Sequence, residues 1–149
     1  MAKKTKQETW VDSTVEQKTT PKKRSGSYSK NKGSSYERQV VKELKEISGN
    51  ENLCTSRSDS KKLDDMKIDV SDVDNALPFY VQCKKTQNLP PIKKLNEEVG
   101  KKDKPLAIFW NAQELKTGNV NITSQGEYVI IPKTLLYSLL EIYYGESDN

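Results

Sequence analysis

The stretch that decides the fold of this chain is Leu77-Pro78-Phe79-Tyr80-Val81-Gln82-Cys83-Lys84-Lys85. Apolar and polar side chains alternate along it, a pattern typical of a β-strand because successive residues face opposite sides. Phe79, Val81 and Cys83 are therefore expected on the core side. Gln82 and Lys84 are expected on the other side, where an amide and an ammonium lie two residues apart. The pattern predicts a strand that packs on one face and carries candidate functional groups on the other.

A second strand is predicted just upstream, at residues 66–70, after a polar loop at residues 49–65 that could hold a short strand near Leu53–Arg57. Its alternation puts Asp69 on the polar face. Residues 71–77 are rich in Asp and Asn and are predicted to form a turn, so the strands at 66–70 and 78–85 would pair as an antiparallel hairpin.

Such a hairpin would bring a carboxylate to the face that already carries the amide and the ammonium. Asp69 would then share one face of the sheet with Gln82 and Lys84. Asp65 and Asp64 lie slightly earlier in the chain and stay open as alternatives, because the register of the strand decides which acid reaches that face.

A helix is predicted upstream of these strands, over about residues 35–48. Ser34 and Glu37 have the spacing of a capping box, with the serine as N-cap and the acid at N3. Apolar residues recur at helical spacing through Tyr36, Val40, Val41, Leu44 and Ile47. Packed against the sheet, this helix could add the Glu37 carboxylate to the same site.

The chain after the hairpin predicts a strand–helix–strand unit. Pro90-Pro91 opens a helix that ends at Gly100, and a continuous apolar run at residues 106–110 predicts a strand buried on both faces. A crossover of this kind makes that strand parallel to the one at 78–85.

The C-terminal part is predicted as a loop at residues 111–126, a short strand at 128–131 and a helix after Pro132. The helix carries an apolar stripe, expected in the core but wide enough to serve as a dimer interface: Leu135, Leu139, Leu140 and Tyr143. The order of all elements indicates an α/β fold with one mixed central sheet flanked by helices.

The composition excludes several classes of protein. The chain has 33% hydrophobic and 31% charged residues, no apolar run of membrane-spanning length and no apolar segment of a secretory signal. Cys54 and Cys83 form no disulfide framework, so a cytoplasmic setting is expected. Histidine is absent, which excludes His triads, His general bases and His metal ligands. Any chemistry must then use carboxylates, amides, lysines and a bound metal.

The charge of the chain is unevenly distributed. Residues 1–33 hold nine basic and three acidic residues, a balance of +6, whereas residues 34–149 have a balance of −2. With little apolar content, residues 1–33 are predicted to form a disordered basic arm that contacts nucleic acid through phosphates. Residues 34–149 are predicted to form the folded domain.

The candidate groups suit hydrolysis of a phosphodiester with a divalent metal. Mg²⁺ prefers oxygen ligands, which Asp69, Gln82 and Glu37 could supply. The metal would polarise a phosphoryl oxygen and activate water, while the Lys84 ammonium orients the water or stabilises developing negative charge.

These residues resemble the motif of the PD-(D/E)-x-K nuclease superfamily, which has a helical Glu, an Asp on one strand and an acid-x-Lys on the next. Glu37, Asp69 and Gln82-x-Lys84 occupy these positions here. The segment Gly33–Lys42 is similar to the first helix of archaeal-type Holliday junction resolvases and their phage relatives. The Gln-x-Lys variant resembles Mrr-type restriction endonucleases. Two features depart from the motif: Ile68 stands in place of the proline, and Gln82 in place of the acid.

The resemblance implies a restriction-endonuclease-like α/β/α core, Mg²⁺ or Mn²⁺ as cofactor and a homodimer acting on four-way or otherwise branched DNA. Residues expected to contact the DNA are Arg57, Ser58, Lys85, Lys93 and Lys94. Two alternatives stay open: a restriction- or repair-type nuclease on duplex DNA, and a catalytically inactive nucleic-acid-binding protein, which the uncharged Gln82 favours.

Overall fold

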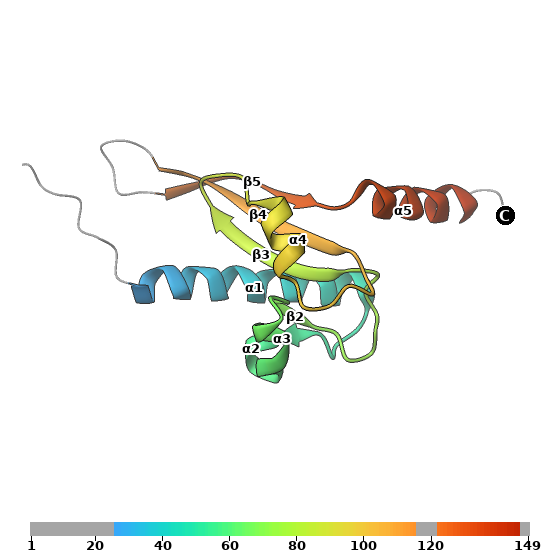
Figure 1. Cartoon of the computed structure of the whole chain (residues 1–149), viewed down its shortest axis with the longest axis horizontal. Coiled ribbons are helices and arrows are strands. Elements are labelled where there is room, and N and C mark those ends of the chain that lie inside the picture. The colour runs from blue at the N-terminus through green and yellow to red at the C-terminus, as the bar shows by residue number, and fades with distance from the viewer. Residues whose placement is uncertain (1–25, 116–121, 147–149) are drawn as a thin grey trace, which may run out of the picture.

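The computed structural model describes residues 26–115 and 122–146, which form a mixed α/β fold (Figure 1). Three strands make the main sheet, in the order β3 (Tyr80–Thr86), β4 (Leu106–Leu115) and β5 (Ile122–Ile130). Strand β3 is parallel to β4, and β4 is antiparallel to β5.

A second, separate sheet pairs the two-residue strands β1 (Cys54–Thr55) and β2 (Val70–Ser71) in antiparallel fashion. The expected single sheet is therefore wrong for the described residues, whereas the mixed α/β class and the flanking helices are confirmed. Because β2 pairs with β1, β3 keeps one edge without a laddered neighbour in the described part of the chain.

Two helices cover opposite faces of the main sheet. Helix α1 (Gly26–Ser48) packs Tyr36, Val40, Val41 and Leu44 against Val81 of β3, with Phe79 and Cys83 beside it. Helix α4 (Ile92–Glu98) packs on the other face, where Leu95 and Val99 contact Leu106 and Ile108 of β4. The alternation predicted for residues 79–83 is confirmed, since Val81 faces α1 while Tyr80 packs in the α4 cluster.

The strand–helix–strand unit is also confirmed. Strand β3, helix α4 and strand β4 follow one another, and the parallel register pairs Gln82 with Ile108 and Lys84 with Trp110. Neighbouring residues of parallel strands point to the same side, so the side chains of Gln82 and Lys84 leave the sheet on the α4 face.

Helix α1 begins at Gly26, not near residue 35. Ser34 therefore lies inside the helix and cannot be its N-cap, and its hydroxyl accepts a hydrogen bond from Arg57 Nη1 at 3.0 Å instead. Of the predicted arm, residues 26–33 belong to this helix, while residues 1–25 lie outside the described residues.

The predicted loop at 49–65 contains two short helices, α2 (Ser56–Asp59) and α3 (Lys61–Asp65). The Ser60 side chain accepts a hydrogen bond from the Leu63 N–H and so caps α3. Polar side chains such as serine form local bonds of this kind with the backbone.

The strand predicted at 66–70 is reduced to Val70–Ser71. Lys67 has a φ of 60°, a left-handed conformation that ends any regular strand at this point. The predicted ladder between 66–70 and 78–85 is therefore wrong, although one hydrogen bond joins the two segments, from the Asp69 N–H to the Val81 carbonyl at 2.8 Å.

Residues 111–126 were predicted as a loop, yet β4 continues to Leu115 and β5 begins at Ile122. Polar side chains in this extension bond to one another: Asn111 Oδ1 accepts from Gln113 Nε2 at 2.7 Å and from Ser124 Oγ at 2.9 Å. Hydrogen bonding between polar side chains makes burial of this polar strand tolerable, which the sequence pattern did not indicate. Residues 116–121 lie outside the described residues.

The helix predicted after Pro132 is confirmed as α5 (Lys133–Gly145), but its place in the core is wrong. Figure 1 shows α5 projecting away from the sheet beyond the end of β5. Of its residues, all of which the structure describes, Leu135 alone is buried. The exposed apolar residues are Leu136, Tyr137, Leu139, Leu140, Ile142, Tyr143 and Tyr144. In the described ranges, no helix is long and apolar enough to cross a membrane.

Candidate active site

Asp69 is the best-fixed residue of the candidate site. Its carboxylate Oδ2 accepts a hydrogen bond from the Cys83 N–H at 2.7 Å. Its own N–H donates to the Val81 carbonyl at 2.8 Å, and its carbonyl accepts from the Ser56 N–H at 2.9 Å. These three bonds hold the Asp69 carboxylate against the edge of β3 that has no paired strand, which we call its free edge, between the positions of Gln82 and Lys84.

Glu37 reaches the same place from helix α1. It is 4% exposed, and its carboxylate Oε1 lies 3.2 Å from Arg57 Nη2. Its pKa is raised from 4.5 to about 7, chiefly by burial and then by the negative charge of Asp69, while Arg57 and Lys84 oppose the shift. The Asp69 carboxylate thus lies close enough to Glu37 to disfavour its ionisation.

Burial raises the pKa of Asp69 as well. The Cys83 hydrogen bond and the positive charges of Lys84 and Arg57 act in the opposite direction. Lys84 therefore lies close enough to stabilise both carboxylates, Asp69 and Glu37. The thiol of Cys83 has a pKa raised by burial and then by the two carboxylates, which makes it a poor nucleophile.

Gln82 is 4% exposed, and its side-chain Oε1 has no hydrogen-bond partner among the described residues. An amide oxygen that is buried without a partner costs free energy, commonly about 1–3 kcal/mol. Such an atom is a candidate ligand for a cation.

The expectation that Asp69, Gln82 and Lys84 share one face of a sheet is wrong in its geometry. Gln82 and Lys84 leave β3 on the α4 face, whereas Glu37 comes from the helix on the opposite face. Asp69 lies at the edge between them. The candidate site therefore lies at the free edge of β3. Glu37 approaches this edge from the α1 face, and Gln82 and Lys84 approach it from the α4 face.

The structure brings Asp69 to the site and leaves Asp65 exposed on α3. Asp64 comes closer, since its Oδ1 lies 3.9 Å from Arg57 Nε and its charge raises the pKa of both Glu37 and Asp69. Its part in the site comes through Arg57, and the sequence pattern did not indicate that role.

The residues predicted to contact DNA fall into two groups. Arg57 lies at the carboxylates, whereas the Ser58 hydroxyl donates to the Thr55 carbonyl at 2.8 Å and so closes the first turn of α2. Lys94 lines a groove of about 570 Å³ together with Lys84, and it pairs with Glu98 at 3.8 Å.

This groove runs from Lys84 along the segment between β3 and α4. Its other lining residues are Thr86, Gln87, Asn88, Leu89, Pro90, Pro91, Leu95 and Glu98. Lys93 is exposed on α4 and Lys85 is half-buried on β3, and neither lines the groove. The groove was not predicted from the sequence, although Pro90 and Pro91, which line it, mark the start of a predicted helix.

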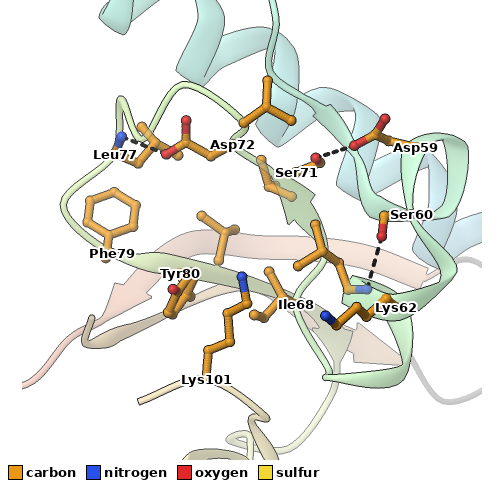
Figure 2. Close-up of a pocket in the computed structure, with 14 residues that line it drawn as sticks. Asp59, Ser60, Lys62, Ile68, Ser71, Asp72, Leu77, Phe79, Tyr80 and Lys101 are labelled. Carbon is orange, nitrogen blue, oxygen red and sulfur yellow. Dashed lines mark hydrogen bonds between the residues drawn. The ribbon is translucent and has the colours of Figure 1, made fainter. Parts of the chain in front are cut away.

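A second cavity, of about 370 Å³, lies between β2 and β3 (Figure 2). None of the four candidate catalytic residues lines it: Glu37, Asp69, Gln82 and Lys84. At its rim the Ser71 hydroxyl donates to Asp59 Oδ2. That bond ties the end of α2 to β2 and thereby fixes the backbone next to Arg57.

The donor set fits a hard divalent cation. Two carboxylates and an unpartnered amide oxygen, from Glu37, Asp69 and Gln82, are ligands of the kind that Mg²⁺ and Mn²⁺ take. The described residues contain no cluster of three His, Cys, Asp or Glu side chains that could hold a metal ion. Glu37 and Asp69 are only two such side chains. The amide oxygen of Gln82 would therefore have to be the third protein ligand of a metal at this site.

The chain was compared with protein-family models, with curated proteins and with solved structures. No match was found.

Replacing Gln82 by glutamate tests whether its oxygen belongs to the site. We expect Gln82→Glu to raise the affinity for Mn²⁺ about tenfold, since a full charge replaces a dipole among the ligands. Without metal the same change should lower the free energy of unfolding, because a third carboxylate joins two that already repel. Isothermal titration calorimetry and urea unfolding measure the two effects.

Gln125→Glu, on an exposed residue of β5, is the matched control and should change neither quantity. An unchanged Mn²⁺ affinity in Gln82→Glu would show that position 82 does not contact the metal.

Proposed function

We propose that this chain is a divalent-metal-dependent DNA endonuclease with a restriction-endonuclease-like α/β/α core of the PD-(D/E)-x-K type, acting in the cytoplasm as a resolvase of four-way or other branched DNA. The observation that carries the proposal is the Asp69 carboxylate, which the Cys83 N–H holds at the edge of β3 at 2.7 Å. Its negative charge raises the pKa of Glu37, and the positive charge of Lys84 lowers the pKa of both carboxyls. Two carboxylates and a lysine around one point are the groups that metal-assisted phosphodiester hydrolysis requires.

Each residue has a distinct role in this proposal. Glu37, Asp69 and the Gln82 oxygen would hold Mg²⁺ or Mn²⁺, which when bound polarises the scissile phosphate and acidifies water. The Cys83 N–H orients the Asp69 carboxylate through its hydrogen bond to Oδ2. Lys84, on the wall of the groove, would stabilise the negative charge that develops on the phosphate.

The groove beside Lys84 supports a nucleic-acid substrate. It is open, extends along residues 86–91 and carries Lys94, paired with Glu98, on its α4 side. A DNA backbone that lies in it would have its phosphates next to both lysines, and contacts of this kind position a strand without reading its sequence.

A cleavage assay tests the function. Purified protein is incubated with a four-way junction or with linear duplex, in Mg²⁺, Mn²⁺ or chelator. Symmetric nicks in the junction that require metal support a resolvase, and equal cleavage of linear duplex would favour the restriction- or repair-type alternative. Binding of DNA without cleavage in either metal would contradict both nuclease proposals and favour an inactive binding protein.

Self-association through α5 is part of the proposal, because cutting two symmetric strands of a junction requires two active sites. The helix is apolar nearly all round, and Leu140 and Ile142 are exposed. A helix of this composition is normally buried, and a second copy of the chain would bury it.

We expect Leu140→Glu to convert a dimer into a monomer, because a carboxylate at the centre of an apolar interface is costly to desolvate. Sedimentation velocity measures the change in mass. Ile47→Glu alters an equally apolar but more exposed side chain on α1 and should leave the dimer intact. A wild-type chain that sediments as a monomer at all concentrations would contradict the proposed dimer.

A further inference from the structure

Arg57 forms an ion pair with Glu37 in the candidate site. Its Nη2 lies 3.2 Å from Glu37 Oε1, and its Nη1 donates to Ser34 Oγ at 3.0 Å, so the guanidinium is held on helix α1 by two neighbouring residues. Its Nε lies 3.9 Å from Asp64 Oδ1 on the solvent side. The guanidinium is thus placed between a buried carboxylate and an exposed one.

The burial of the two partners differs in a way that matters. The Glu37 side chain is 6% exposed, whereas those of Arg57 and Asp64 are 40% and 46% exposed. Arg57 is therefore the cation that neutralises Glu37 from the solvent side. A divalent metal that binds Glu37 has to share that carboxylate with the guanidinium or displace it.

The backbone that carries Arg57 is fixed. The Ser56 N–H donates to the Asp69 carbonyl at 2.9 Å, and Ser71 ties Asp59 to β2 at the other end of α2. Helix α2 is consequently anchored at both ends. An exchange of the Arg57 partner then needs only rotation of its side chain, from Glu37 toward Asp64 or toward solvent.

We infer that Arg57 is a latch that couples metal binding to the arrival of a phosphate backbone. In the free protein the guanidinium of Arg57 is paired with the Glu37 carboxylate, competes with the metal for it and so weakens metal binding. A phosphodiester at the site offers the guanidinium a bidentate partner, which frees the Glu37 carboxylate for the metal. By linkage, bound metal must raise the affinity for DNA by the same factor as DNA raises the affinity for metal. This inference rests on the proposed function.

The test measures Mn²⁺ affinity by isothermal titration calorimetry, without DNA and with a saturating four-way junction. All proteins in the test carry Lys84→Ala, so that the DNA stays intact. In this background we expect the junction to raise Mn²⁺ affinity by roughly tenfold, a typical size for coupling between two ligands. Adding Arg57→Gln should raise the affinity in the absence of DNA by a similar factor and abolish the effect of the junction.

Arg38→Gln is the matched control, because it removes the same charge from an exposed residue next to Glu37 on α1. It should leave both affinities near those of the background protein. Circular dichroism melting verifies that each variant is folded, and Arg57→Lys, which keeps the charge at this position, provides a second variant with an intermediate effect.

The failure of the latch and the failure of the proposed function are distinguishable. If Mn²⁺ binds and Asp69→Asn abolishes binding, yet Arg57→Gln matches the background protein with and without DNA, the latch is wrong and the metal site stands. If no protein binds Mn²⁺ under either condition, the metal site itself is refuted, and the latch with it.

Discussion

Lys84→Ala is expected to lower metal-dependent cleavage by about 10³-fold, since loss of one positioned cation at a developing negative charge costs this much in enzymes that rely on such stabilisation. The side chain lines the groove, and its charge acts on both Glu37 and Asp69. Single-turnover cleavage of a four-way junction at saturating protein measures the chemical step separately from DNA binding.

Lys42→Ala is the control, because Lys42 is exposed on α1. It should retain wild-type cleavage. Lys84→Ala should still bind the junction, with a modest loss from one phosphate contact. Cleavage by Lys84→Ala at the wild-type rate would contradict the proposed role of Lys84 in the reaction. The groove would then be only a DNA-binding surface.

Glu37→Gln is expected to change stability and activity in opposite directions. In the metal-free protein at pH 8, the substitution should raise the free energy of unfolding by up to roughly 3 kcal/mol, because it removes a buried charge whose pKa is raised from 4.5 to about 7. With the carboxylate gone, metal affinity and cleavage should fall sharply. Urea unfolding in chelator and Mn²⁺ calorimetry give the two values.

The direction of the pH dependence follows from this shift. The folded chain holds the Glu37 proton up to about pH 7, whereas the unfolded chain releases it near 4.5, so wild-type stability falls as the pH rises through this window. Glu37→Gln lacks this loss, and the two proteins should differ little at pH 4 and most at pH 8.

Glu46→Gln, an exposed change on the same helix, should follow the wild type at every pH. If Glu37→Gln is less stable than the wild type at pH 8, the ion pair with Arg57 outweighs the cost of burial. The raised pKa of Glu37 would then be wrong.

Strong local periodicity made part of this fold predictable. The alternation over residues 79–83 predicted β3 and its two faces, and the Pro90-Pro91 pair with its apolar stripe predicted α4. The apolar run at 106–110 predicted the core of β4 and its parallel pairing. In each case the local pattern and the final packing agree, because the same residues that favour the element are the ones that become buried.

Predictions failed where polar side chains form specific bonds. Residues 111–126 look like a loop, but Asn111, Gln113 and Ser124 satisfy one another within paired strands. Residues 56–65 also look like a loop, yet Ser60 caps α3. A periodicity argument counts polar residues as solvent-facing and does not detect partners that only the folded chain provides.

The sequence by itself limited the residue types that the proposed site can use, since a chain without histidine leaves carboxylates, amides and lysines for this chemistry. The tertiary structure decided how they meet. The left-handed backbone at Lys67 ends the expected strand, so Asp69 lies at the free edge of β3 and not in a ladder. That edge is where a helix from one face and side chains from the other can reach the same point. Arg57 also reaches this place. It lies 20 residues after Glu37 in the sequence, and only the fold brings the two side chains into contact.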